Sequence, residues 1–138
     1  MKNNLKFNSA ICTSRVQSER LLTLGLKKET TDMSWVLVDE DREGNEYSVE
    51  YLSIEKYQLL HPDWYTPAWS LNRLIEMMPE EICDGLLCIY KDAIRYEEMV
   101  MDRLESHVEF FGDNMYENAI SCIEWLIKKG HFNKEYLA

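Results

Sequence analysis

The chain has little glycine and proline, and this scarcity already disfavours several kinds of site. Its 138 residues contain five glycines and three prolines. The sequence has no GxSxG nucleophile motif, no glycine-rich phosphate loop and no dinucleotide-binding fingerprint, all of which need glycine at fixed spacings. Most of the five glycines stand where a turn or a helix end is expected. The sequence therefore disfavours nucleotide-dependent chemistry, and we expect no cofactor.

Long apolar runs are also missing. No stretch approaches the roughly 18 apolar residues that a membrane-spanning helix needs, so we expect no membrane span. The N-terminal segment MKNNLKFNSAIC lacks the apolar core of a signal peptide. We therefore expect a cytoplasmic protein, in which the cysteines at positions 12, 83, 88 and 122 are reduced.

Positive charge is in short supply. The chain has 15 Lys and Arg against 25 Asp and Glu, a net charge of −10. Nucleic acids are bound mainly through clustered cations, so we expect no direct nucleic-acid binding. Acidity of this kind is ordinary in a soluble cytoplasmic protein. An acidic inhibitor that mimics nucleic acid and occupies a DNA-binding surface is the alternative interpretation.

What is present indicates one folded domain over residues 1–138, with residues 1–12 loosely ordered. Apolar residues make up 46% of the chain and charged residues 29%, the composition of an ordinary globular protein. Capping residues and apolar stripes predict three helices. They are expected over about 15–24, 70–78 and 114–130, with Ser14, Ser70 and Asn114 at their first turns and Gly25, Pro79 and Gly130 at their ends.

Short β-prone runs predict the strands. A hairpin is expected between Trp35 and Leu52, a second hairpin over residues 85–99, and a last edge strand over residues 106–112. Residues 97–105 also have some helical spacing, so a helix remains an alternative there. The predicted fold class is α+β, a small mainly antiparallel sheet of four or five strands with two or three helices packed on one face.

Candidate chemistry is sparse. Cys83 and Cys88 have only a loose zinc spacing and no second pair, so we expect no metal site. Cys88 with His107 across neighbouring strands would suit a small hydrolase, the least favoured function, because no oxyanion-stabilising turn accompanies either residue. Adjacent acids such as Glu97 and Glu98 point in different directions and are read as solvated charge. We therefore predict no catalytic residue.

An aromatic group is the candidate binding site. It comprises Tyr57, His61, Trp64, Tyr65 and Trp69. Tyrosine and tryptophan are frequent in binding hot spots because they bury a large area and keep a polar group. The alternative is that Trp64 and Trp69 plug the end of the sheet beneath a loop. Both interpretations stay open.

Three segments together carry a resemblance: LLTLGLKKETTDMSW at 21–35, TPAWSLNRLIEMMP at 66–79 and NAISCIEWLIKKGHF at 118–132. In order and spacing they resemble a family of small uncharacterised proteins that recur in Bacteroides-type genomes, often in prophage or mobile elements. The resemblance implies a bacterial or phage cytosolic origin and brings no activity with it. The function we expect is a non-catalytic protein-binding or adaptor module that holds an unknown protein partner or a second copy of itself.

Overall fold

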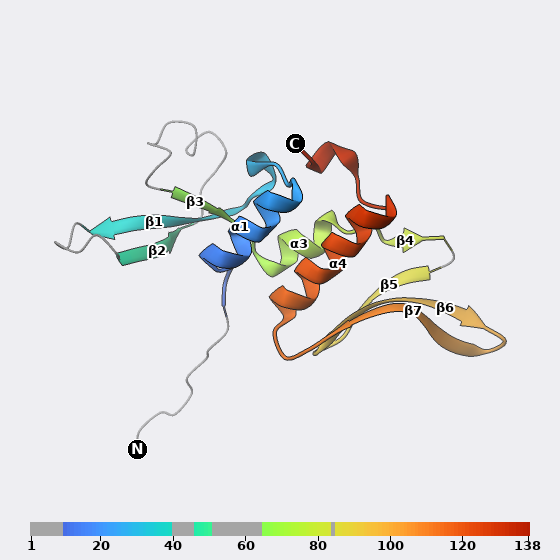
Figure 1. The fold of residues 1–138 in the computed structure, drawn as a ribbon. Coiled ribbons are helices and arrows are strands. Elements are labelled where there is room, and N and C mark those ends of the chain that lie inside the picture. Colours follow the sequence, from blue (N-terminus) through green and yellow to red (C-terminus); the bar gives the residue numbers. More distant parts are fainter. Residues whose placement is uncertain (1–9, 40–45, 51–64, 84) are drawn as a thin grey trace, which may run out of the picture.

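A computed structural model describes residues 10–39, 46–50, 65–83 and 85–138 (Figure 1). In chain order the described elements are α1 (Arg15–Leu24), η1 (Lys28–Thr30), β1 (Met33–Asp39), β2 (Glu46–Glu50), β3 (Tyr65–Ala68), α3 (Leu71–Met77), β4 (Glu81–Ile82), β5 (Gly85–Ile89), β6 (Ala93–Val100), β7 (Arg103–Phe111), α4 (Met115–Lys129) and η3 (Lys134–Tyr136). The predicted α+β class is confirmed.

The described strands form two antiparallel sheets, whereas the sequence predicted one. The first sheet has the order β2-β1-β3 and the second the order β4-β5-β6-β7. The helices lie between the two sheets in the view of Figure 1, with α4 running along β6 and β7. Strand pairing joins residues that are distant in the chain, and local periodicity does not determine how strands divide between sheets.

Local signals place all three helices at the predicted positions. At α1, Ser14 and Gln17 satisfy each other's free backbone N–H groups, and Gly25 closes the helix in the left-handed conformation with φ of 107°. Asn114 Oδ1 accepts hydrogen bonds from the first turn of α4, and Gly130 ends that helix at φ of 76°. These caps act within one helical turn, so the sequence alone reveals them.

The core lies between α4, α1, α3 and the inner face of the β4–β7 sheet. The residues of α4 that fill it are Ala119, Ile120, Cys122, Ile123 and Leu126, all fully buried. Ile94 and Tyr96 of β6 meet them from the sheet, and Trp125 packs against the rings of Tyr96 and Phe110. The apolar stripe of α4 thus covers one face of the sheet, as predicted.

Residues 97–105 form the end of a β-hairpin, so the helical alternative for this segment is wrong. β6 and β7 pair from Ala93 opposite Phe111 to Val100 opposite Arg103. Met101 and Asp102 make the turn with φ of 48° and 66°. Two positive φ angles suit a two-residue hairpin turn, but this turn lacks the Asn-Gly or Asp-Gly pair that usually signals it.

No helix in the described part of the chain is long and apolar enough to span a bilayer.

Candidate functional site

Exposed apolar side chains gather on the β4–β7 sheet. In the described residues nine large hydrophobic side chains are exposed, and seven of them lie between positions 86 and 111. These seven are Leu86, Ile89, Tyr90, Met99, Met101, Leu104 and Phe111, whereas Ile11 and Val16 lie elsewhere. A sheet region with so many exposed apolar side chains is a candidate contact surface.

Strand alternation separates the two faces of this sheet. Ile94 and Tyr96 of β6 point to the inner face and are fully buried. The residues between and beyond them, Arg95, Glu97 and Met99, therefore point to the outer face. No described helix or strand packs on that face, and we call it, together with the turn at Met101, the outer face.

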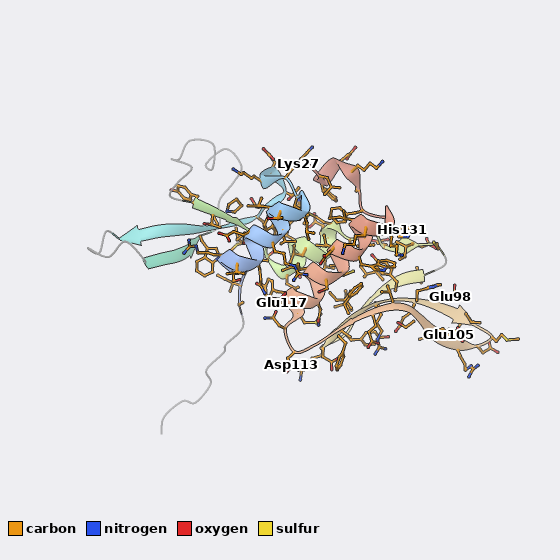
Figure 2. All side chains as sticks on the ribbon, viewed as in Figure 1. Lys27, Glu98, Glu105, Asp113, Glu117 and His131 are labelled. Carbon is orange, nitrogen blue, oxygen red and sulfur yellow. The ribbon has the colours of Figure 1, made fainter. Side chains whose placement is uncertain are left out.

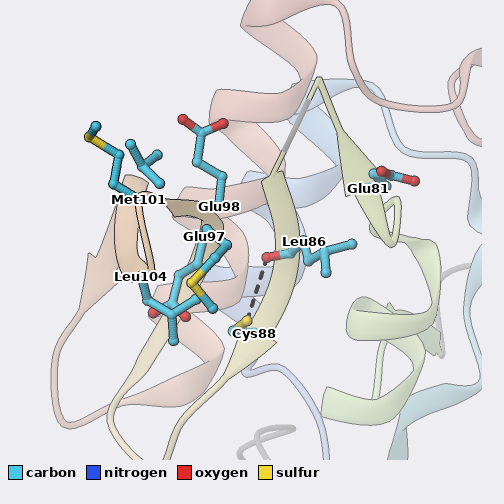
Figure 3. Close-up of a pocket in the computed structure, with 9 residues that line it drawn as sticks. Glu81, Leu86, Cys88, Glu97, Glu98, Met101 and Leu104 are labelled. Carbon is cyan, nitrogen blue, oxygen red and sulfur yellow. Dashed lines mark hydrogen bonds between the residues drawn. The ribbon is translucent and has the colours of Figure 1, made fainter.

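The register places apolar residues of three strands side by side on the outer face. Leu86 of β5 is opposite Glu97, and Met99 of β6 is opposite Leu104 of β7. The side chains of Met99, Leu104 and Met101 are 66%, 62% and 91% exposed. They surround a shallow depression of about 660 Å³. Figure 3 shows Leu86 between Glu81 on one side and Met101 and Leu104 on the other.

A polar cluster centred on Glu97 adjoins the depression. Glu97 is only 5% exposed, yet both carboxylate oxygens accept hydrogen bonds of 2.9 Å from the hydroxyl of Tyr90. Arg95 Nη1 lies 3.3 Å from the same carboxylate, and the guanidinium also covers the ring of Tyr90. Burial would raise the pKa of Glu97, but hydrogen bonds from Tyr90, Cys88 and Arg95 outweigh it and hold the pKa below its ordinary value.

Arg95 is held between two carboxylates. Its Nε lies 2.5 Å from Glu109 Oε2, while Nη1 faces Glu97. The Nε contact is an ion pair whose geometry is not that of a hydrogen bond. The one cation of the cluster is thus already engaged on both sides, and the cluster as a whole is anionic.

Cys88 and His107, the pair that the least favoured hydrolase alternative would use, lie on opposite faces of the sheet. Cys88 is opposite Arg95 and so faces outward. His107 is the extra residue of a bulge in β7, its Nε2 lies 3.0 Å from Glu98 Oε2, and a Cβ at Gly85 would come within 2.9 Å of its ring. Both Gly85 and Glu98 are on the inner side. The dyad is therefore not assembled.

The pKa values of Cys12, Cys88 and Cys122 are raised. Burial, the hydrogen bond to Glu97 and the charge of Glu97 together raise the pKa of Cys88. Burial raises the pKa of Cys122 to about 12, and burial with the charge of Asp32 raises that of Cys12 to about 11. A nucleophilic cysteine needs a lowered pKa. Within the described residues no group of three or more His, Cys, Asp or Glu side chains could hold a metal ion.

Of the predicted aromatic site, only Tyr65 and Trp69 can be placed. Tyr57, His61 and Trp64 lie outside the described residues. Tyr65 is half-buried in β3, and its Cα is paired with that of Val36 in β1. Trp69 is fully buried: its Nε1 donates to Thr30 Oγ1 at 2.9 Å and its backbone N to Thr13 Oγ1 at 3.1 Å. For Trp69 the core interpretation therefore holds, and this side chain cannot reach a partner.

The outer face was missed at the sequence level, although a signal exists. Phe111 is out of phase with the inward-facing Val108 and Phe110, and Met99 is out of phase with Ile94. Leu104 is in phase with Val108 in the sequence and reaches the outer face only because of the bulge at His107. Apolar residues in both phases of a strand are typical of burial on both faces. Here the second phase is exposed, which only the placement of the helices reveals.

Comparison with known proteins adds no relative. No family model matches the chain, and neither a curated protein nor a solved structure matches it. The resemblance to small Bacteroides-type proteins stays a prediction. What the chain does must therefore be inferred from its own residues.

Proposed function

We propose that the chain is a non-catalytic protein-binding module and that the outer face of the β4–β7 sheet is its contact surface. The observation that carries this proposal is the concentration of exposed apolar side chains on this sheet, seven of the nine in the described part of the chain, of which Leu86, Met99, Met101 and Leu104 line the depression on the outer face. Leaving such side chains in water brings no gain in folding free energy, whereas covering them with a partner does.

The layout of the outer face suits protein contact. Flexible, exposed Met99 and Met101 adapt to the shape of a partner, since methionine is unbranched and polarisable. The rigid polar cluster of Tyr90, Arg95 and Glu97 beside them offers hydrogen-bonding groups at fixed positions. An apolar centre with polar groups at its edge is the usual composition of a protein interface.

A non-catalytic role is supported by the chemistry of the side chains. Cys88 has a raised pKa and lies on the opposite face from His107. The nucleic-acid mimic remains a prediction. It is less supported, because described glutamates such as Glu117, Glu124 and Glu76 pair with arginines and do not form an unbroken anionic surface.

The test is photo-crosslinking. A photo-reactive amino acid at position 104 should cross-link a protein in a lysate of the source organism. The same amino acid at position 16 is the control, because Val16 is 75% exposed but lies on α1, away from the sheet. Equal cross-linking at the two positions, or none at either, would contradict the proposal.

A further inference from the structure

The depression on the outer face combines apolar side chains with acidic ones. Leu86, Met99, Met101 and Leu104 provide its apolar lining. Three glutamates, Glu81, Glu97 and Glu98, also line it, and no lysine or arginine does so among the described residues. An apolar surface bordered by charge of one sign selects a partner of the opposite sign.

The carboxylates differ in how far they are already neutralised. Glu81 is exposed and forms no ion pair within the described part of the chain, so its charge is free for a partner. Glu97 shares Arg95 with Glu109. Glu98 touches His107 and is also directly opposite Glu105 on the neighbouring strand (Figure 2). Residues 85–111 contain six acidic side chains and only three lysines and arginines. The strands and turns of this sheet therefore carry a net negative charge.

We propose that the occupant of the depression is a cationic amphipathic segment of another protein, with apolar side chains next to lysine or arginine. This inference rests on the proposed function and names the kind of partner. The apolar side chains of the segment would lie against Met99, Met101 and Leu104, and its cations would face the exposed carboxylate of Glu81. Met-rich surfaces with adaptable shape suit such segments.

A second copy of the chain is the less suitable occupant. Each copy carries a net charge of −10, and the acidic excess is present on the same strands that would meet. Pairing two outer faces would bring carboxylates against carboxylates, which disfavours association. An anionic lipid surface is disfavoured for the same reason.

The probe is a synthetic amphipathic peptide of leucine and lysine, titrated into the full chain by calorimetry. A matched peptide with glutamate at every lysine position is the control. We expect the lysine peptide to bind at least about tenfold more tightly, with an affinity that falls between about 50 mM and about 500 mM salt as charges are screened.

Four variants tie this binding to the depression. Leu104→Thr should weaken the lysine peptide severalfold, and Val16→Thr should not. Glu81→Gln should weaken it by about two- to fivefold, the range of a partly exposed ion pair. Glu135→Gln removes the same charge from an exposed residue of η3, far along the chain from the sheet, and should have no such effect.

The outcomes separate this inference from the proposed function. If both peptides bind equally and Leu104→Thr weakens both, the outer face binds proteins but the cationic partner is wrong. Equal losses of affinity for the lysine peptide in Glu81→Gln and Glu135→Gln would mean unspecific electrostatic attraction. That result would also overturn the inference of a cationic partner. Sedimentation that shows a dimer abolished by Leu104→Thr would make a second copy the occupant. If neither peptide binds and cross-linking at position 104 also fails, the proposed function itself is wrong.

Discussion

The two faces of the β4–β7 sheet are built from the same strands and differ in what covers them. On β6, Ile94 is fully buried beneath α4, whereas Met99, five residues further along, is 66% exposed. Both side chains are apolar, so hydrophobicity does not distinguish them. An apolar group contributes to folding only to the extent that it is removed from water. The inner face is thus explained by stability, and the outer face requires another explanation, for which we propose contact with a partner.

The largest expected effect on stability comes from a substitution on the inner face. Ile94→Ala should lower the free energy of unfolding by about 2–5 kcal/mol, because it leaves a cavity against α4. Met99→Ala on the same strand should change it by less than about 0.5 kcal/mol. Urea denaturation monitored by tryptophan fluorescence measures both. Similar losses in the two variants would mean that the outer face is covered within the monomer.

The next effect concerns the turn that projects from the outer face. Asp102→Gly should raise the free energy of unfolding by about 0.5–1 kcal/mol, because glycine adopts a φ of 66° without the steric cost of a side chain. The matched control is Asp92→Gly in the neighbouring hairpin turn, where φ is not positive. There the substitution should lower the free energy of unfolding, since glycine adds freedom to the unfolded chain. If both substitutions changed the free energy of unfolding in the same direction, the left-handed conformation of Asp102 would be contradicted.

A smaller effect, the pH dependence of stability, tests the polar cluster of the outer face. The folded pKa of Glu97 lies below its ordinary value of 4.5, so its ionised form stabilises the fold above the unfolded pKa. This contribution is lost as the pH falls through the folded pKa. Glu97→Gln cannot ionise, so its urea midpoint should fall less than that of the wild type between pH 7 and about pH 3. Tyr90→Phe should reduce the acid sensitivity in the same direction, and equal acid sensitivity in all three proteins would exclude a role for this hydrogen bond.

The helices could be predicted because their signals are local. Ser14 with Gln17, Ser70 before α3, and Asn114 with Gly130 around α4 each act within about one turn of the chain. The apolar stripe of α4 likewise predicted that this helix would cover a sheet. These features need no knowledge of the rest of the fold.

The sheets and the candidate site could be predicted only in part. The β6–β7 turn contains Met101 and Asp102, which give no turn signal in the sequence, so a helix remained an alternative there. In the sequence, a tryptophan such as Trp69 is equally consistent with an interface and with the core. Only its burial and its hydrogen bond to Thr30 assign it to the core. The outer face depends on which side α4 covers, which is a property of the whole fold.

The most direct test of the outer face as a contact surface is a paired measurement on Leu104→Thr and Val16→Thr. Both substitutions shorten or polarise an exposed aliphatic side chain, so both proteins should keep the unfolding free energy of the wild type within about 0.5 kcal/mol. We predict that Leu104→Thr loses partner capture while Val16→Thr retains it. Undiminished capture by a stable Leu104→Thr protein would contradict the assignment of the outer face.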